Sequence, residues 1–532
     1  MMYNAYAPRL LMGLQSSRSR LPNAANLLGL TVLMISCFFV ISCGNSNPGI
    51  PLPELTPGTV TTTQNPLVAQ YTISPAQTAS VYVEFGTDTQ YALQTSSQQT
   101  PAGGGSVSIL VAGMRQNTTY HMRAVVTYSD NAVQYDTDHT FTSGPIPANR
   151  MPQARGTIPS GMAPTPGIEL ASLNPGTSNQ LELVAFNPSG NIIWYYDYDS
   201  SLGIPQPVKL LPNGDMLMVL NPSGNAGTVR EIDLAGNTIH QLTVSDLNQW
   251  LSAAGDNLTV YSLNHDILPL SNGHLLLLGS DVQTFTDLPG SPGQTVVTGN
   301  DIVDLDANDK PVWMWKAFDH LDVNRHPMSF PDWTHANTLV YSPDDGNLLL
   351  SLRHQHWVIK IDYENGEGNG DVIWRLGYQG DFTLDAGAPA NWFYAQHDAT
   401  IVSPNSTGDF LLGVFDNGDN RVLDSNGTIC GSLGAAACYS RAAIFEVNET
   451  EMTAHVAWSY RTVYSFWGGV TQLLPNSNVF FDITAPADNP TGARVVEATQ
   501  QPDPQLVWQL DINGQNSYRT IHLPSLYHGV QW

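Results

Sequence analysis

The sequence is poor in positive charge. It contains 20 Lys and Arg against 46 Asp and Glu among 532 residues, which gives a formal net charge of -26. Proteins that bind DNA or RNA use basic surfaces to release counterions from phosphates, so this composition excludes nucleic acid as a partner. Because the overall charge repels small anions, an anionic substrate would need a local pocket of cationic or N–H-donating side chains.

A long hydrophobic run is also missing. The apolar stretch at residues 27–41 is shorter than the about 20 residues that span a bilayer, and it lies between Arg18 and Arg20 on one side and Cys43 on the other. This order is typical of a bacterial lipoprotein signal. We predict that residues 1–43 direct export and that Cys43 carries lipid, which would anchor a periplasmic protein to the membrane, expected to be the outer membrane. An uncleaved N-terminal anchor is the alternative.

Cysteine is scarce, with four residues in the chain. Cys37 lies in the predicted signal, so Cys430 and Cys438 are the two cysteines of the exported body besides Cys43. They lie close together in the sequence, and an oxidising compartment favours a local disulfide between them. A zinc site is disfavoured because the pair lacks the spacing of zinc-binding cysteines.

The composition is that of an all-β protein. Charged residues make up only 12%, long helical heptads are absent, and the chain has 45 Gly, 36 Pro, 12 Trp and 21 Tyr. Residues 44–57 are rich in Pro, Asn, Ser and Gly, which predicts a flexible tether. Residues 58–147 contain short alternating strands and resemble a fibronectin type III or immunoglobulin-like β-sandwich.

A diverged repeat occupies residues 156–532. Each copy has an apolar strand, a turn rich in Asp, Asn or Gly, and then an apolar residue followed by Trp, which predicts the four-stranded blades of a six-bladed β-propeller. The copies average about 63 residues, longer than the roughly 40 to 50 of ordinary blades, so we expect insertions, with residues 281–300 and 378–392 as loops. We interpret the Trp residues as packing residues between blades. The pairs are Ile193-Trp194, Val312-Trp313, Ile373-Trp374, Ala457-Trp458 and Val507-Trp508, with Ile239-His240 as a weak sixth.

Histidines gather in the middle of the repeat, where nine of the 14 lie between His240 and His397. In a propeller, one stretch from each blade reaches the central funnel, so residues distant in sequence can meet around one ligand. His265, His335, Arg353 and His397 are 70, 18 and 44 residues apart, which fits contributions from successive blades. We therefore expect these four side chains to form an anion site.

Five segments around these residues resemble, in order, motifs of the bacterial arylsulfate sulfotransferases. The family implies a small β-sandwich followed by a six-bladed propeller, and transfer of a sulfuryl group from an aryl sulfate donor to a phenol acceptor through a sulfated histidine. The matching segments are Asn264-His265-Asp266-Ile267, Asp332-Trp333-Thr334-His335-Ala336-Asn337, Ser351-Leu352-Arg353-His354-Gln355, Gln396-His397 and Phe415-Asp416-Asn417-Gly418-Asp419-Asn420-Arg421.

Carried over by motif, the resemblance implies that His397 is the nucleophile. His265, His335, Asn337 and Arg353 would then hold the sulfuryl oxygens, and either His335 or His265 would be the general acid and base. Further candidate substrate contacts are His354, Trp392 and Phe466.

The resemblance implies no cofactor and no nucleotide sulfate donor, and the sequence has no glycine-rich phosphate-binding motif between a strand and a helix. Two other functions stay open. The first is a noncatalytic, lipid-anchored propeller that binds a ligand or a protein. The second is a metalloenzyme that uses His354 and His356, although the ligand spacing is not distinctive and we predict no metal. The oligomeric state is open too, with a homodimer as one option.

Overall fold

The computed structural model describes residues 54–174, 179–222, 227–404, 408–434 and 437–532. The predicted signal, Cys43 and most of the tether lie outside the described residues. Residues Glu54–Trp532 form one compact unit. Within the described residues, no helix is long and apolar enough to cross a membrane.

The first nine strands form two antiparallel sheets. Buried and half-buried residues alternate along β2 and most of β3, as expected for strands that cover a core with one face. One sheet contains β1 (Thr59–Thr62), β2 (Ala69–Ile73) and β6 (Val107–Val111). The other contains β3 (Ala79–Gly86), β4 (Leu93–Gln94), β5 (Gln98–Gln99), β7 (Thr119–Tyr128), β8 (Val133–Tyr135) and β9 (His139–Thr142).

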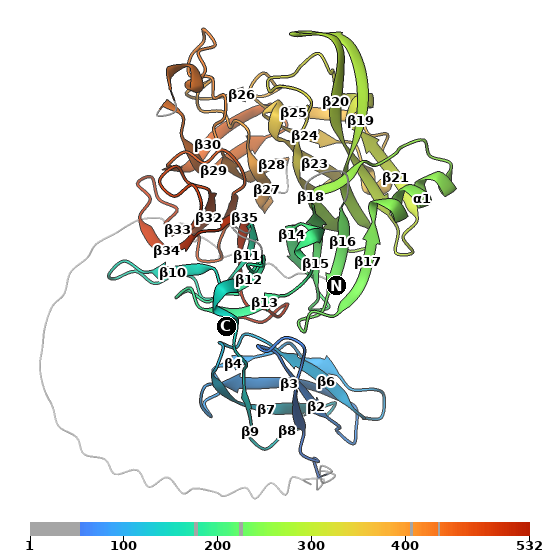
Figure 1. Ribbon diagram of the computed structural model, residues 1–532, viewed down its shortest axis with the longest axis vertical. Helices are drawn as coiled ribbons and strands as arrows, with labels where there is room; N and C mark the ends of the chain where they lie inside the picture. Colours follow the sequence, from blue (N-terminus) through green and yellow to red (C-terminus); the bar gives the residue numbers. More distant parts are fainter. Residues whose placement is uncertain (1–53, 175–178, 223–226, 405–407, 435–436) are drawn as a thin grey trace, which may run out of the picture. The chain divides into compact units, whose positions relative to one another are not determined.

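The later strands form six sheets of four or five strands among the described residues, and we name these sheets blades 1 to 6 (Figure 1). Blade 1 contains β11 (Ile168–Asn174), β12 (Leu183–Phe186), β13 (Ile192–Tyr196) and β35 (Asn516–Leu523). Blade 2 contains β14 (Ile204–Leu210), β15 (Met216–Asn221), β16 (Thr228–Ile232) and β17 (Thr238–Thr243). Blade 3 contains β18 (Ser262–Pro269), β19 (Leu275–Leu288), β20 (Ser291–Leu305) and β21 (Pro311–Lys316).

Blade 4 contains β22 (Ala336–Ser342), β23 (Asn347–Leu352), β24 (Trp357–Ile361) and β25 (Val372–Gly377). Blade 5 contains β26 (Thr383–Leu384), β27 (His397–Pro404), β28 (Asp409–Asp416), β29 (Ser440–Asn448) and β30 (Thr453–Thr462). Blade 6 contains β10 (Gln153–Thr157), β31 (Val470–Leu473), β32 (Val479–Thr484), β33 (Ala493–Ala498) and β34 (Leu506–Asn513). The α-helices are α1 (Val244–Ala254) and α2 (Ala317–His320). Short 3-10 helices are η1 (Ala148–Arg150), η2 (Ser200–Leu202), η3 (Arg353–Gln355), η4 (Glu364–Gly366) and η5 (Cys430–Leu433).

The blades close into a ring. The inner strands β35, β14, β18, β22, β27 and β31 contact one another in that order, and β31 contacts β35 again. Two pairings join the ends of the chain: β35 completes blade 1 beside β11, and β10 completes blade 6 beside β34. The predicted all-β fold, a β-sandwich followed by a six-bladed propeller, is confirmed.

The repeated Trp joins each blade to the next. The indole N–H of Trp194 on β13 donates to Leu234 O, which follows β16 in blade 2. The other four predicted tryptophans make equivalent bonds, to Gly368 O, Glu449 Oε1, Thr499 O and Pro188 O. At the weak sixth repeat, His240 contacts Asp309 in blade 3 instead. The fourth strand of each blade, counted from the inner strand, therefore carries at least one polar link to the next blade.

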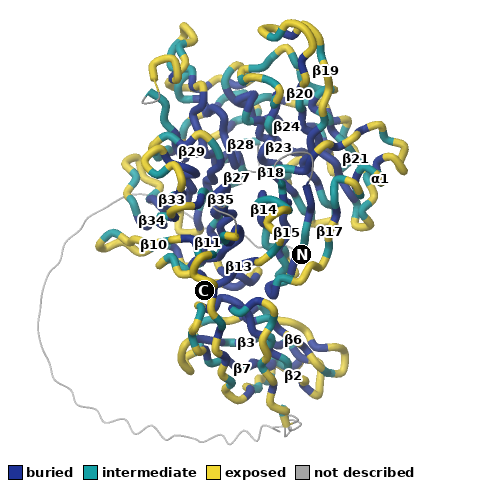
Figure 2. Tube along the Cα trace, viewed as in Figure 1, coloured by how far each residue is buried: buried dark blue, intermediate teal, exposed yellow. Residues whose placement is uncertain are grey.

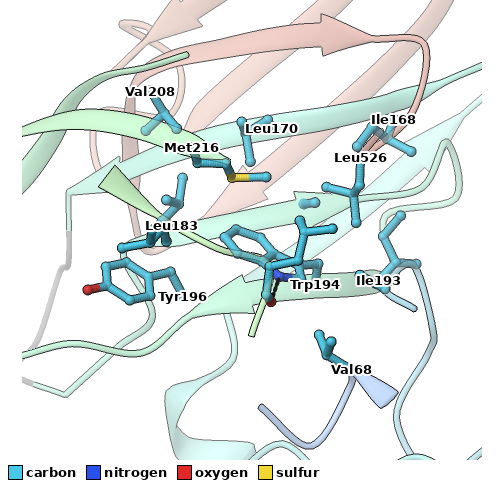
Figure 3. Packing of buried hydrophobic residues seen from close by; sticks show 14 of the residues in the cluster. Val68, Ile168, Leu170, Leu183, Ile193, Trp194, Tyr196, Val208, Met216 and Leu526 are labelled. Carbon is cyan, nitrogen blue, oxygen red and sulfur yellow. Dashed lines mark hydrogen bonds between the residues drawn. The ribbon is translucent and has the colours of Figure 1, made fainter. Parts of the chain in front are cut away.

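Apolar side chains fill the spaces between the sheets, and the loops at the periphery are exposed (Figure 2). The cluster around Trp194 joins blades 1 and 2 (Figure 3). Val68 and Ala112 of the sandwich belong to this cluster as well. The hydroxyl of Tyr527, near the C-terminus, accepts a hydrogen bond from Ala112 N at 2.7 Å.

One expectation about insertions is wrong. Residues 281–300 are not a loop, because they extend β19 and β20 into one long hairpin, in which Val282 pairs with Thr298 and Thr284 with Val296. Outside the short strand β26, residues 378–392 are irregular as predicted. The disulfide between Cys430 and Cys438 is confirmed and lies in the segment between β28 and β29.

Candidate active site

The inner strands are irregular where the predicted site residues lie. The strand register shifts between Leu263 and Ile267 on β18 and between His397 and Thr400 on β27. His265 and His335 have positive φ angles of 60° and 46°. Bulges redirect side chains, and a positive φ in a residue other than glycine persists only where its surroundings enforce it. The backbone is therefore bent at the positions that deliver the histidines.

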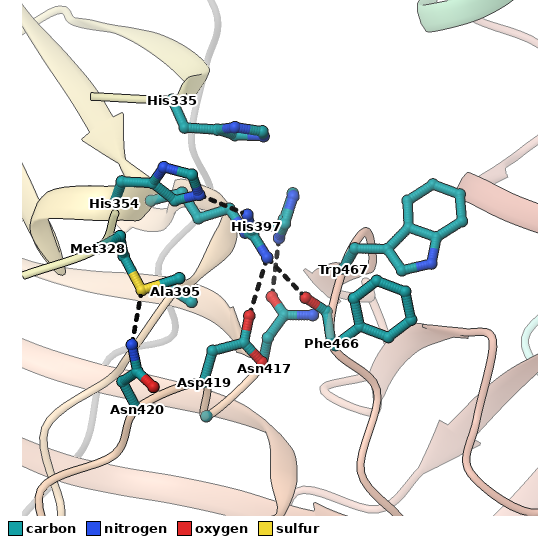
Figure 4. Close-up of polar contacts among 12 residues, drawn as sticks. Met328, His335, His354, Ala395, His397, Asn417, Asp419, Asn420, Phe466 and Trp467 are labelled. Atoms are coloured by element: carbon teal, nitrogen blue, oxygen red, sulfur yellow. Dashed lines mark hydrogen bonds and ion pairs between the residues drawn. The ribbon is translucent and has the colours of Figure 1, made fainter. Parts of the chain in front are cut away.

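These bends bring side chains from blades 3, 4 and 5 together. The ring centroids of His265 and His335 are 4.7 Å apart, those of His335 and His354 are 4.6 Å apart, and His397 lies 6.4 Å from His335. Figure 4 shows His335, His354 and His397 gathered, with Phe466 and Trp467 on the opposite side from Met328. We call His265, His335, His354 and His397 the histidine cluster.

His397 is buried, with 1% of its surface exposed, and its tautomer follows from its neighbour Asn417. The Asn417 amide donates to Ser465 O at 2.9 Å and to Gly468 O at 3.1 Å, so the Asn417 oxygen must face His397 Nδ1. The Nδ1 to Oδ1 distance is 2.7 Å. The proton therefore resides on Nδ1, and Nε2 accepts a hydrogen bond from Gly468 N at 3.3 Å.

The charge state of the cluster follows from burial. Burial, followed by the positive charge of Arg353, holds the pKa of His397 well below the ordinary value for histidine. Burial and then His335 have the same effect on the pKa of His265, and they lower the pKa of His354 to about 4. These three rings are neutral near pH 7, when the cluster holds no anion.

Arg353 supplies the fixed positive charge beside the cluster. Its Nη2 donates to Asp419 Oδ2 and to Phe466 O, each at 2.8 Å, and its Nη1 donates to His354 Nε2 at 2.7 Å. Its Nε is buried and has no hydrogen-bond partner among the described residues. The guanidinium is thus held in one orientation with one donor unused.

His335 is paired with a carboxylate. Its Nδ1 makes a short hydrogen bond with Asp332 Oδ2, so its Nε2 is left for the interior of the cluster. Burial alone would raise the pKa of Asp332, but the charge of His335 and its hydrogen bond outweigh burial and lower that pKa. Asp332 is therefore ionised and orients His335, an arrangement typical of a general base and its orienting acid.

His265 has a neutral partner instead. Its Nδ1 lies 3.1 Å from the hydroxyl of Tyr518, which comes from β35, the last strand of the chain. Burial raises the pKa of Tyr518 to about 12, so the hydroxyl stays protonated. His265 and His335 thus differ in the partner that orients them.

Of the remaining predicted residues, Asn337 and Phe466 lie near the histidine cluster and Trp392 does not. Asn337 is buried, and its amide donates to Gln396 O at 2.7 Å, immediately before His397. Phe466 lies at the site and is 52% exposed. Trp392 is 4% exposed and packs in the hydrophobic core against Phe445, away from the histidine cluster.

Sequence reasoning assigned no role to Asp332, Asn417, Gly468 and Tyr518, all of which contact the histidine cluster. Asp332 and Asn417 lie inside the matched motifs, so their positions were a usable signal. Arg421, at the end of the last matched segment, forms a buried ion pair in which its Nη2 contacts Asp416 Oδ2 at 2.7 Å.

Three of these groups lie close enough to share a metal ion: Asp332, His335 and His354. Both ring nitrogens of His354 are already engaged, since Nε2 accepts from Arg353 and Nδ1 donates to Asp332 O. His356, the other predicted metal ligand, accepts a hydrogen bond from Ala395 N instead. A metal at this position would have to replace one of these two His354 hydrogen bonds.

A sequence model of the arylsulfotransferase (ASST) family matches residues 167–519, which cover the blades and the histidine cluster. The chain belongs to this family. It is 27% identical over 169 residues to the arylsulfate sulfotransferase AssT of Escherichia coli O6:H1, a match that covers 27% of this chain and 25% of the relative. This arylsulfotransferase family member thus spans about a quarter of the curated relative's length.

Two solved structures are similar over much of this family member. A variant of Synechocystis apocarotenoid oxygenase covers 70% of the chain and 96% of its own, with 10% identity and a TM-score of 0.31. The dihydro-heme d1 dehydrogenase NirN covers 68% of the chain and 78% of its own, with 10% identity and a TM-score of 0.29.

Proposed function

We propose that this protein is an aryl sulfotransferase that moves a sulfuryl group from a phenolic sulfate ester to a phenol through a sulfohistidine at His397. The observation that carries the proposal is the state of His397. The Asn417 oxygen accepts its Nδ1–H, and burial lowers its pKa, so the ring is a neutral imidazole whose Nε2 accepts a long hydrogen bond, at 3.3 Å, from Gly468 N.

In the first half-reaction, His397 Nε2 attacks the sulfur of the donor. The N–S bond forms while the bond between sulfur and the phenolic oxygen breaks, and the departing phenolate takes a proton. In the second half-reaction, the acceptor phenol loses its proton and its oxygen attacks the same sulfur, which releases His397. The cycle needs no nucleotide and no cofactor.

We assign the proton transfers to His335 rather than His265. His335 is oriented by the ionised Asp332, which stabilises the imidazolium that forms when His335 takes a proton. His265 faces the hydroxyl of Tyr518, a neutral group that offers no such stabilisation. Asp332 thus distinguishes the two candidates.

The sulfuryl oxygens carry the charge that develops during transfer. We expect four donors to hold these oxygens: Arg353, His265, the amide of Asn337 and Gly468 N–H. Hydrogen bonds hold Arg353 and Gly468 N–H in place before the substrate arrives. Removal of one such donor typically costs about 2.7 to 4 kcal/mol of transition-state stabilisation. The donor's aryl ring would lie against Phe466, with His354 on the other side of Arg353.

The predicted location belongs to the same proposal. An export signal at residues 1–43 and lipid on Cys43 would hold the propeller at the periplasmic side of a membrane, where the confirmed disulfide is stable. The membrane would contact the protein only through this anchor.

The test uses residues 44–532 with p-nitrophenyl sulfate, with and without phenol, and intact mass measurement of the donor-treated protein. We expect phenol-dependent release of nitrophenol and one added sulfuryl group, which His397→Ala abolishes. Release that does not depend on phenol would indicate a sulfatase. If several aryl sulfates give neither release nor a mass shift, the protein is a binding propeller and the proposal is wrong.

A further inference from the structure

Two cavities flank the histidine cluster. The first, of about 680 Å³, is lined by His265 and Asp332 and extends over blades 1 and 2. The second, of about 640 Å³, is lined by His354, Met328 and Phe330. Because His335 lies between His265 and His354, both cavities adjoin the same reacting centre.

The first cavity is lined mainly by hydrogen-bonding side chains. They come from five elements, β11, η2, β14, β15 and β18, so the lining is a built surface rather than one polar loop. Gln206 is only 8% exposed, and the described lining residues include no Phe, Tyr or Trp. The amide and hydroxyl side chains are Asn174, Ser200, Ser201, Gln206, Asn221, Ser262 and Asn264.

The lining of the first cavity is acidic. Glu182 lines it, is 4% exposed and accepts a short hydrogen bond from Tyr198, and no Lys or Arg is among its described lining residues. An anionic group would therefore be repelled, and an apolar group would not pair with the buried Gln206 or with the half-buried amides of Asn221 and Asn264. A binding site of this kind discriminates strongly against ligands that lack matching hydroxyls.

The second cavity is also polar in part, through Ser291, Ser329 and Asn420, but it adds Met and Phe surface that the first one lacks. Pro327, Met328 and Phe330 offer apolar surface beside His354, which suits an unsubstituted aromatic ring. A simple phenol needs only that surface, so the polar cavity next to His265 has no role with such a substrate.

We propose that the first cavity binds a neutral, hydroxyl-rich appendage, such as a glycosyl or polyol group, carried by the acceptor phenol. This inference rests on the proposed sulfotransferase activity and names the class of acceptor that fits it. The phenolic oxygen would face His335 and the sulfated His397, while the appendage reaches the amides and hydroxyls of blades 1 and 2.

The test compares two acceptors that differ only in the appendage. Both arbutin, which is 4-hydroxyphenyl β-D-glucopyranoside, and 4-methoxyphenol carry an alkoxy group opposite the reacting hydroxyl. With p-nitrophenyl sulfate as donor and residues 44–532 as enzyme, we expect kcat/KM for arbutin to be at least about 10-fold higher, the effect of two or three neutral hydrogen bonds.

Two variants in the first cavity and one in the second locate the effect. Asn221→Leu and Ser201→Val should reduce kcat/KM for arbutin about 10-fold and leave that for 4-methoxyphenol within about 2-fold. Ser329→Ala, in the second cavity, is the matched control and should leave the preference unchanged. Thermal melting checks that each variant is folded.

The outcomes separate the two proposals. Turnover of both acceptors at equal kcat/KM overturns the inference about the cavity, as does an equal loss of the preference in Ser329→Ala. Absence of acceptor-dependent turnover with any phenol overturns the sulfotransferase proposal itself, and the inference with it.

Discussion

The inner and outer strands of the propeller use opposite kinds of sequence. Along the outer strands, one device recurs, a Trp whose indole N–H bonds the next blade, as Trp194 and Trp508 do. The inner strands differ from blade to blade, and β18 and β27 contain bulges beside His265 and His397. Repetition at the outer strands determines the ring, while departures from regularity at the inner strands create the chemical site.

Asp332→Asn tests the inner side of this comparison. We expect the rate of His397 sulfation by phenyl sulfate to fall about 10²- to 10⁴-fold, because His335 loses the carboxylate that stabilises its protonated form. With p-nitrophenyl sulfate, whose leaving group needs little protonation, the fall should be less than about 10-fold. Single-turnover kinetics measure both rates.

Asp322→Asn, an exposed acid of the same loop, is the matched control and should change neither rate. The melting temperature should be unchanged in both variants, because the side chain of Asp332 is 41% exposed. An equal loss with the two esters would mean that Asp332 acts in binding the sulfuryl group and not in proton transfer.

Trp508→Ala tests the outer side. The side chain is 1% exposed, and its indole N–H donates to Pro188 O at 2.8 Å, so we expect the free energy of unfolding to fall by about 3 to 5 kcal/mol. The kcat/KM of the folded enzyme should stay within about 3-fold, because Trp508 is on β34, which β32 and β33 separate from the inner strand β31. Urea unfolding gives the stability.

Trp508→Phe keeps a ring and loses only the hydrogen bond, so its destabilisation should be nearer to about 1 kcal/mol. A large loss of kcat/KM in folded Trp508→Ala would show that the outer strands also determine the site geometry, and the distinction between the two regions would fail.

The same contrast explains what sequence alone could predict. The Trp repeat and the ordered motifs identified the ring and the four converging side chains, because both are local patterns. Tyr518 gave no signal, since it reaches His265 only after β35 has closed blade 1. The hairpin at residues 281–300 was mistaken for a loop because its Gly and Pro content conceals cross-strand pairing, which only the partner strand reveals.

His522→Gln tests the strand pairing that joins the end of the chain to blade 1. In this pairing β35 lies beside β11, and His522 lies opposite Glu169. Burial disfavours the charged form of His522, but the hydrogen bond and charge of Glu169 outweigh burial and raise the pKa of His522. Burial also raises the pKa of Glu169, so the folded pair binds protons more tightly than the unfolded chain.

The stability that this pair contributes is therefore present below the unfolded histidine pKa of about 6.5 and is lost as the pH rises through the folded value. We expect His522→Gln to lower the free energy of unfolding by about 1 to 3 kcal/mol at pH 6 and by less at pH 9. Urea unfolding at the two pH values measures it, and a larger loss at pH 9 would contradict this sign.

The smallest expected effect is that the rate of His397 sulfation hardly depends on pH. An ordinary histidine loses about nine tenths of its neutral form one pH unit below its pKa of about 6.5. Because burial holds the pKa of His397 well below that value, its sulfation at saturating p-nitrophenyl sulfate should change less than about 3-fold between pH 7.5 and 5.5. Asn417→Asp should restore the acid limb, since a carboxylate beside Nδ1 favours the protonated ring. An acid limb near pH 6.5 in the unmodified protein would mean that burial in the inner ring does not control the nucleophile.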